Sequence, residues 1–91
     1  ERKSIAAICA APMALEAYGI TEGKRVTSYP TCQQEMETLQ PSSVYVDEAV
    51  VEDDFLITSR GPGTAIEFSL RLIAKLCSRE KSEEIRQSIV A

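Results

Sequence analysis

The side chain best suited to chemistry is Cys9. It ends an apolar run over residues 4–8 and precedes Ala10, Ala11 and Pro12. Such a run is typical of a strand buried on both faces, and Pro12 fits the first turn of a helix. A thiol at this junction lies where open α/β sheets bind ligands, and helix N–H groups favour its thiolate. The spacing therefore predicts a cysteine nucleophile on a tight turn.

The residues alone also permit a second interpretation, in which Cys9 is a buried structural thiol. We interpret Cys32, which follows a Pro-Thr turn, as an incidental and partly exposed thiol. Cys77 shares an apolar helix face, which predicts core packing. The chain has three cysteines, no C-x-x-C pair and no histidine. The usual zinc sites and a Cys–His dyad within this chain are therefore excluded, and no metal is predicted.

Hydrophobic patterning and turn residues place the elements around Cys9. Strands are predicted over residues 4–8, 24–28, 44–51 and 55–59, and helices over residues 11–18, from residue 64 onward and over 80–89. Residues 31–39 are weakly helical or loop, and residues 40–43 form a loop. The last two strands form a hairpin whose acidic tip, residues 52–54, is expected to be solvated. The acidic residues from Asp47 to the tip lack the spacing of a calcium loop.

A glycine turn connects the hairpin to the next helix. Its R-G-P-G sequence at residues 60–63 lacks the Lys-Ser/Thr of a phosphate-binding loop, so a structural turn is preferred. Thr64 and Glu67 match a capping box. Arg60, with Gly61 and Pro62, is a candidate for a dimer contact or for the wall of the site.

Composition narrows the class of protein. Of the 91 residues, 44% are hydrophobic, which makes a packed core plausible, and the net charge of −4 with scattered basic residues argues against nucleic acid. No apolar stretch approaches the ~20 residues of a membrane-spanning helix, and no signal peptide is visible at Glu1. A chain without an initial Met looks processed or cut. We expect an intracellular protein and prefer the cytoplasm as its compartment. A location in an organelle is the alternative, because the original amino end is absent.

Only the strand at residues 4–8 is expected to be buried on both faces, whereas a parallel sheet needs several such strands. We therefore expect residues 1–91 to be the carboxyl-terminal part of a single α/β domain. The missing strands would come from an upstream segment or a separate chain.

Three blocks carry a resemblance to a known family. They are A-A-I-C-A-A-P at residues 6–12, V-T-S-Y-P at 26–30, and L-I-T-S-R-G-P-G-T at 56–64, followed by Glu67 and Phe68. In order and spacing they resemble the DJ-one/ThiJ/PfpI superfamily, in particular the subfamily of the parkinsonism-associated deglycase. The resemblance covers essentially the whole chain and corresponds to the carboxyl-terminal half of that domain.

The resemblance implies a flavodoxin-like three-layer sandwich with a mostly parallel sheet, usually a homodimer. It implies that Cys9 is the reactive thiol and that no cofactor is needed. A glutamate and the oxyanion glycines would come from the amino-terminal half. Ala10, Tyr29 and Pro30 are then candidates for contact with substrate or thiolate. Tyr29 stands where many members carry a histidine, and a phenol is a poor proton shuttle near neutral pH.

Two functions from different classes follow from this resemblance. The first is a cofactor-independent glyoxalase or deglycase, in which Cys9 attacks a small reactive carbonyl compound and yields a 2-hydroxy acid. The second is a redox-sensing or chaperone-like stress protein that uses oxidation of Cys9. An amidase or peptidase of the wider superfamily is a third, weaker interpretation, against which the absent histidine counts.

Overall fold

The computed structural model describes residues 3–38 and 43–91. It contains five strands, four helices and two short 3-10 turns, with three consecutive strands ahead of the last two helices. In chain order they are β1 (Ile5–Ile8), α1 (Ala11–Ala17), β2 (Arg25–Val26), η1 (Pro30–Cys32), α2 (Gln33–Thr38), β3 (Val44–Tyr45), β4 (Val50–Asp53), β5 (Leu56–Ser59), η2 (Pro62–Thr64), α3 (Ala65–Leu76) and α4 (Arg79–Ser88).

The main sheet has the strand order β1-β5-β4. β1 runs parallel to β5, with Ile8 opposite Ser59, while β4 is antiparallel to β5, with Val50 opposite Ser59. The short strands β2 and β3 form a separate parallel pair. The carboxyl ends of β1 and β5 therefore meet at one edge of the sheet, which is the edge that carries Cys9.

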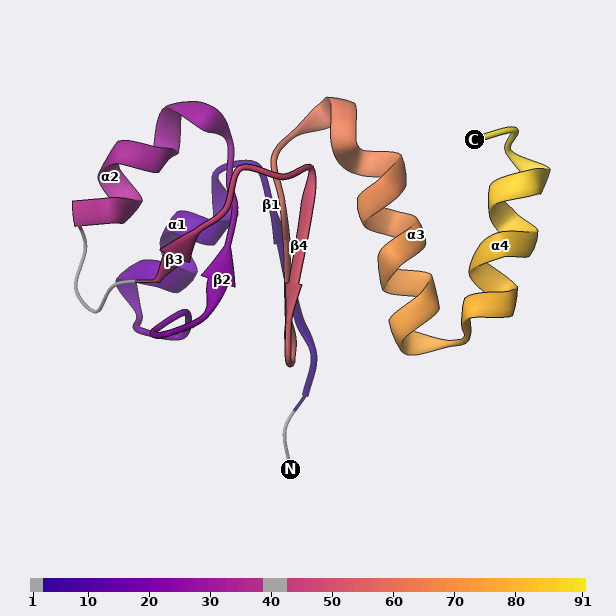
Figure 1. The fold of residues 1–91 in the computed structure, drawn as a ribbon, viewed down its shortest axis with the longest axis horizontal. Helices are drawn as coiled ribbons and strands as arrows, with labels where there is room; N and C mark the ends of the chain where they lie inside the picture. Colours follow the sequence, from indigo (N-terminus) through magenta and orange to yellow (C-terminus); the bar gives the residue numbers. More distant parts are fainter. Residues whose placement is uncertain (1–2, 39–42) are drawn as a thin grey trace.

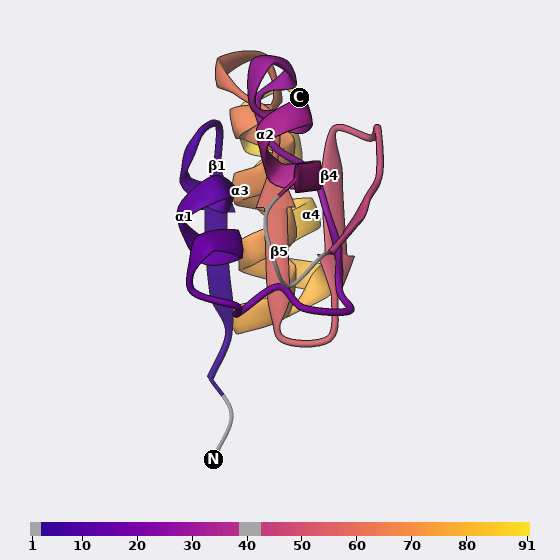
Figure 2. The ribbon, with the colours of Figure 1, turned by 90° about the vertical axis from the view of Figure 1, so that its left-hand side faces the viewer.

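Helices cover both faces of this sheet. In Figure 1 the sheet is seen edge-on, with α1, α2 and the β2–β3 pair on one side and α3 and α4 on the other. Figure 2 shows α1 beside β1, with α3 and α4 behind the sheet. Buried side chains of β2, α2 and β5 form the core cluster, which consists of Val26, Met36 and Leu56. The predicted α/β class and its three layers are confirmed.

The burial of the strands differs from expectation. All four residues of β5 are buried, because β5 lies between β1 and β4. In β1 only Ala7 is buried, and Ala6 is exposed. The expectation that residues 4–8 form the one strand covered on both faces was wrong: β5 is that strand. The pattern of apolar and polar residues does not identify β5 as the strand buried on both faces, because its polar residues Thr58 and Ser59 are buried as well.

The predicted strand over residues 44–51 is two strands that belong to different sheets. Val44 and Val46 donate backbone hydrogen bonds to the carbonyls of Lys24 and Val26, at 2.8 Å each, whereas β4 pairs with β5. The chain must cross between these ladders over residues 46–49. The predicted strand over 24–28 is shorter as well. The hairpin itself is confirmed, with its turn at Asp54 and Phe55 rather than over 52–54.

Two helix predictions also change. Thr64 does not form the predicted capping box with Glu67, because its hydroxyl bonds the Gly61 backbone and Glu67 pairs with Arg86 at 3.1 Å. The last helix begins at Arg79, where the Ser78 hydroxyl accepts the N–H of residue 81. Residues 40–42 of the predicted loop lie outside the described residues. Within residues 3–38 and 43–91, the structure contains no helix with the length and apolar character needed to cross a bilayer.

Candidate active site

Cys9 lies at the sharp junction between β1 and α1. Its φ of 67° is in the left-handed region, which costs a residue with a side chain about 1–3 kcal/mol and persists only where surrounding contacts enforce it. Ala10 follows as the residue before α1, and Pro12 occupies the first turn of that helix, as predicted. The Cys9 side chain is half-buried. The thiol is thus presented on a strained elbow and not enclosed in the core.

Two neighbouring segments hold this elbow through its own backbone. The Cys9 N–H donates to the Ser59 carbonyl at 3.1 Å, and the Cys9 carbonyl accepts the Tyr29 N–H at 2.7 Å. Ser59 ends β5, and Tyr29 lies three residues past β2. Residues about 20 and 50 positions away in sequence therefore fix the left-handed conformation of Cys9.

The predicted contact residues lie on the exposed side of this junction. The Tyr29 side chain is 41% exposed, and Ala10 and Pro30 are exposed too. The Tyr29 carbonyl accepts the N–H of Cys32 at 2.8 Å, which anchors the turn η1. Tyr29 is therefore fixed at its backbone, while its side chain is partly exposed.

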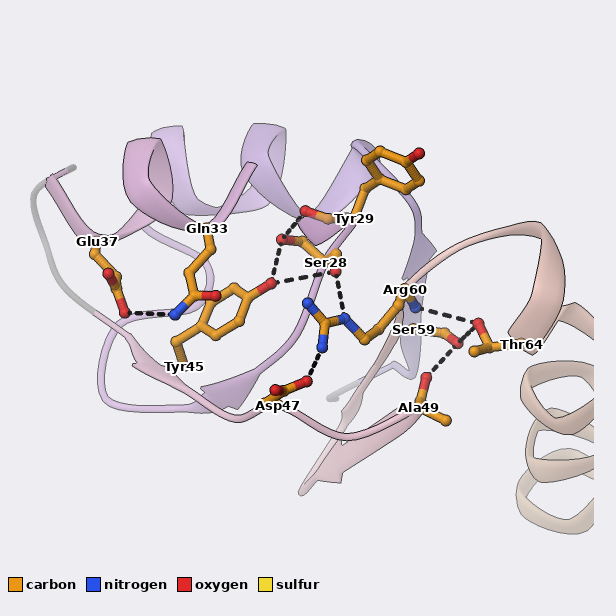
Figure 3. Close-up of polar contacts among 10 residues, drawn as sticks. All are labelled: Ser28, Tyr29, Gln33, Glu37, Tyr45, Asp47, Ala49, Ser59, Arg60 and Thr64. Carbon is orange, nitrogen blue, oxygen red and sulfur yellow. Dashed lines mark hydrogen bonds and ion pairs between the residues drawn. The ribbon is translucent and has the colours of Figure 1, made fainter. Parts of the chain in front are cut away.

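The loop after β5 reaches the same place. A Cβ on Gly61 would lie 3.2 Å from Cδ1 of Tyr29, so the tyrosine ring packs against the Gly61 backbone. Arg60 extends along the loop and donates from Nε to the Ser28 carbonyl at 3.1 Å, while Nη1 pairs with Asp47. Pro62 is exposed at the start of η2. The structure thus brings Tyr29 and the Arg60–Gly61 segment to the Cys9 elbow. Figure 3 shows the polar contacts of Arg60 with Ser28 and Asp47.

Buried hydroxyl groups support the loop after β5, and the sequence interpretation missed them. Ser59 Oγ donates to the Ala49 carbonyl at 2.6 Å and lies 2.6 Å from Thr64 Oγ1 (Figure 3). The Thr58 hydroxyl accepts the buried N–H of Thr27 at 2.9 Å. The sequence did contain a signal for these contacts, namely two hydroxyl residues at the end of an apolar strand. Hydroxyl groups buried in a strand must form hydrogen bonds within the protein.

Comparison with known proteins identifies the family. The model of the DJ-1/PfpI family matches residues 1–75, which is most of the chain. The chain belongs to the DJ-1/PfpI family. Cys9, the Tyr29–Pro30 turn and the R-G-P-G loop all lie within the matched residues.

Individual members of the DJ-1/PfpI family are similar over nearly the whole chain. Protein dj-1beta of Drosophila melanogaster is 44% identical over 86 residues, which cover 94% of this chain and 45% of the relative. The glutathione-independent glyoxalase DJR-1.2 of Caenorhabditis elegans is 42% identical over 81 residues, covering 89% of this chain and 42% of that protein. The crystal structure of Drosophila DJ-1beta superposes with a TM-score of 0.87 at 45% identity, covering 97% of this chain and 46% of that one. This chain therefore spans less than half the length of these relatives, and the predicted sandwich class is confirmed for the part it spans.

The other two cysteines of this DJ-1/PfpI chain are placed differently from expectation. Cys32 is buried at 8% exposure, where partial exposure was expected, and its N–H donates to the Tyr29 carbonyl within the turn η1. Cys77 is exposed and not in the core, because it follows the last residue of α3, where the chain turns toward α4. Ile66 on the same predicted apolar face is 58% exposed. Of the three thiols, only Cys9 combines partial exposure with a strained backbone.

The acidic tip is exposed at Asp54, as expected, while Glu52 and Asp53 are half-buried and form ion pairs. Glu52 of β4 pairs with Lys75 of α3 at 3.3 Å. Asp53 accepts the Arg25 backbone N–H at 2.8 Å, and this hydrogen bond, with the nearby charges of Arg25 and Lys24, holds the pKa of Asp53 below its ordinary value. No cluster of potential metal ligands occurs in the part of the chain that the structure describes.

Proposed function

We propose that this chain carries the nucleophile of a cofactor-independent glyoxalase that converts 2-oxoaldehydes to 2-hydroxy acids. The observation that supports it is the half-buried Cys9 thiol on a left-handed elbow at the carboxyl end of β1. The arrangement is that of a strand–turn–helix nucleophile. The 42% identity to a glutathione-independent glyoxalase favours this chemistry over other uses of a thiolate.

The proposed reaction is balanced without an oxidant or a reductant. The Cys9 thiolate adds to the aldehyde carbon of methylglyoxal, and the oxygen takes a proton to give a hemithioacetal. A proton then leaves the former aldehyde carbon and another is added to the neighbouring carbon, so that the ketone becomes an alcohol and the hemithioacetal a thioester. Water cleaves the thioester and releases lactate, a proton and the free thiol.

The proton transfer needs an acid–base group beside the thiol. Among the described residues, no side chain forms a hydrogen bond with Cys9 Sγ. We assign this role to the glutamate that the family resemblance places in the amino-terminal half, together with the oxyanion glycines of that half. Tyr29, whose backbone is tied to Cys9 and whose ring is exposed, would orient the substrate or the thiolate.

The partner in this proposal is the amino-terminal half of the same domain. Within the described residues β1 pairs only with β5, so its outer edge has no strand. The radius of gyration is 13.4 Å, against about 12 Å for a compact domain of this length. An apolar groove of about 280 Å³ runs between α3 and α4, lined by Ile66, Ile73 and Ile85 among others. These features support residues 1–91 as half of a domain, which we expect to pair into a homodimer.

Turnover of methylglyoxal tests the proposal. Residues 1–91 are combined with the amino-terminal half of the domain, and production of 2-hydroxy acid is compared for Cys9→Ser and Cys77→Ser. We expect Cys9→Ser to lose at least about 100-fold in kcat/KM, while Cys77→Ser, which removes an exposed thiol away from the elbow, keeps the activity. Equal turnover in wild type and Cys9→Ser would refute the proposal. Oxidation of Cys9 remains the alternative use of the same thiol.

A further inference from the structure

A single peptide group connects the Cys9 elbow to the side chains of Arg60 and Tyr45. The peptide joins Ser28 to Tyr29. Its N–H, which belongs to Tyr29, donates to the Cys9 carbonyl at 2.7 Å. Its carbonyl, which belongs to Ser28, accepts from Arg60 Nε at 3.1 Å and from the Tyr45 hydroxyl at 3.2 Å (Figure 3). We propose that Arg60 and Tyr45 are positioning residues for Cys9, acting through the Ser28–Tyr29 peptide.

The physical link lies in the peptide itself. A cationic donor on the carbonyl oxygen polarises the amide and makes its N–H a stronger donor. That N–H is one of the two backbone contacts that hold Cys9 in the left-handed region. A weaker Tyr29 N–H contact would let the elbow relax toward ordinary φ values and move the sulfur away from its place at the sheet edge.

Both donors are held in place for this contact. The Arg60 side chain is 18% exposed, and its Nη1 pairs with Asp47, which leaves Nε directed at the Ser28 carbonyl. The Tyr45 hydroxyl also lies 2.9 Å from Ser28 Oγ, so the ring is fixed by two contacts to one residue. Ser28 is fully buried. The contact is therefore shielded from water, which strengthens it.

Asp47 makes the proposal testable with little risk of misfolding. Its side chain is 82% exposed, so replacement of Arg60 leaves a solvated carboxylate and not a buried one. The chain also offers a matched control. Arg25 donates from its guanidinium to the Glu52 carbonyl at 3.0 Å and pairs with Asp53, but it lies at the opposite end of the sheet from Cys9.

Amide hydrogen exchange tests the contact directly, in residues 1–91 combined with the amino-terminal half of the domain. We expect exchange of the Tyr29 amide to be about tenfold faster in Arg60→Met and several-fold faster in Tyr45→Phe. Arg25→Met should leave it unchanged. Unchanged exchange in both Arg60→Met and Tyr45→Phe would overturn the proposal. If Arg60→Met does not fold, the exchange rate of the Tyr29 amide in Tyr45→Phe decides the test, because that variant removes only a hydroxyl.

The kinetic consequence rests on the proposed function. In Arg60→Met and Tyr45→Phe, kcat for methylglyoxal should fall about five- to tenfold with KM unchanged, and Arg60→Lys should recover part of the loss. The reactive Cys9 thiol is titrated in each variant and kcat is expressed per active site, because a loss of folded enzyme alone would also lower apparent kcat and leave KM unchanged. If Tyr29 exchange responds but the wild-type protein has no turnover, the glyoxalase proposal fails and the positioning proposal stands. If turnover is normal and kcat is unchanged in both variants, the positioning role is refuted.

Discussion

The left-handed backbone at Cys9 makes a prediction about stability that needs no substrate. Cys9→Gly and Cys9→Ala both remove the sulfur and differ only by one Cβ. Glycine adopts a φ of 67° without steric cost, whereas alanine does not. We therefore expect Cys9→Gly to be the more stable of the two, which reverses the usual order for a position next to a helix.

The magnitude follows from two opposing terms. A residue with a Cβ loses about 1–2 kcal/mol in the left-handed region, and glycine loses about 0.5–1 kcal/mol in additional chain entropy. At the centre of these two ranges, Cys9→Gly is more stable than Cys9→Ala by roughly 0.7 kcal/mol. At Cys77, where φ is −116°, only the entropy term applies. There Cys77→Gly should be less stable than Cys77→Ala by about 0.5–1 kcal/mol.

Urea unfolding of the four single variants, in the complete domain, measures both differences. The opposite signs at the two cysteines are the expected result, and the Cys77 pair shows that the assay resolves a single Cβ. The reasoning fails if Cys9→Ala is as stable as Cys9→Gly while the Cys77 pair behaves as predicted. That outcome would mean that residue 9 is not held in the left-handed region.

Two further predictions concern contacts between the layers. Thr58→Val should destabilise the domain by about 1–3 kcal/mol in chemical denaturation, because it leaves the buried Thr27 N–H without an acceptor, and Thr58→Ser should restore most of the loss. Asp53→Asn should lower Tm at pH 7, and this difference should shrink as the pH falls below about 4. The pKa of Asp53 is lowered in the folded protein by the Arg25 N–H, so its contribution exists above the unfolded pKa and disappears as the folded carboxylate is protonated. A difference that stays constant from pH 7 to pH 3 would contradict this.

The sequence predicted the elements that depend on local chemistry. The apolar run before Cys9 forms β1, Pro12 lies in the first turn of α1, and the R-G-P-G segment turns between β5 and α3. Each of these follows from the conformational limits of the residues concerned. The three sequence blocks that resemble the family predicted the sandwich fold and the location of the candidate nucleophile.

Burial was harder to predict from the sequence than secondary structure, because the burial of a residue depends on which other elements pack against it. Glu16 of α1 is fully buried, with one carboxylate oxygen accepting from Thr21, although a glutamate on a short helix is normally exposed. Cys77 continues the 3.6-residue spacing of α3, but the helix ends before it and its side chain is exposed. Periodicity identifies which residues share a face, and the packing of distant segments then determines whether that face is covered.

The candidate site combines these two kinds of information. The nucleophile and its turn are local and visible in the sequence, whereas the contacts that give Cys9 its conformation come from Tyr29 and Ser59. Both contacts are made by backbone atoms, so side-chain identity at 29 and 59 matters less to the elbow than the direction of the chain there. A histidine at position 29 would offer the same backbone N–H to the Cys9 carbonyl as Tyr29 does. For proton transfer, the proposed function relies on the carboxylate of the other half.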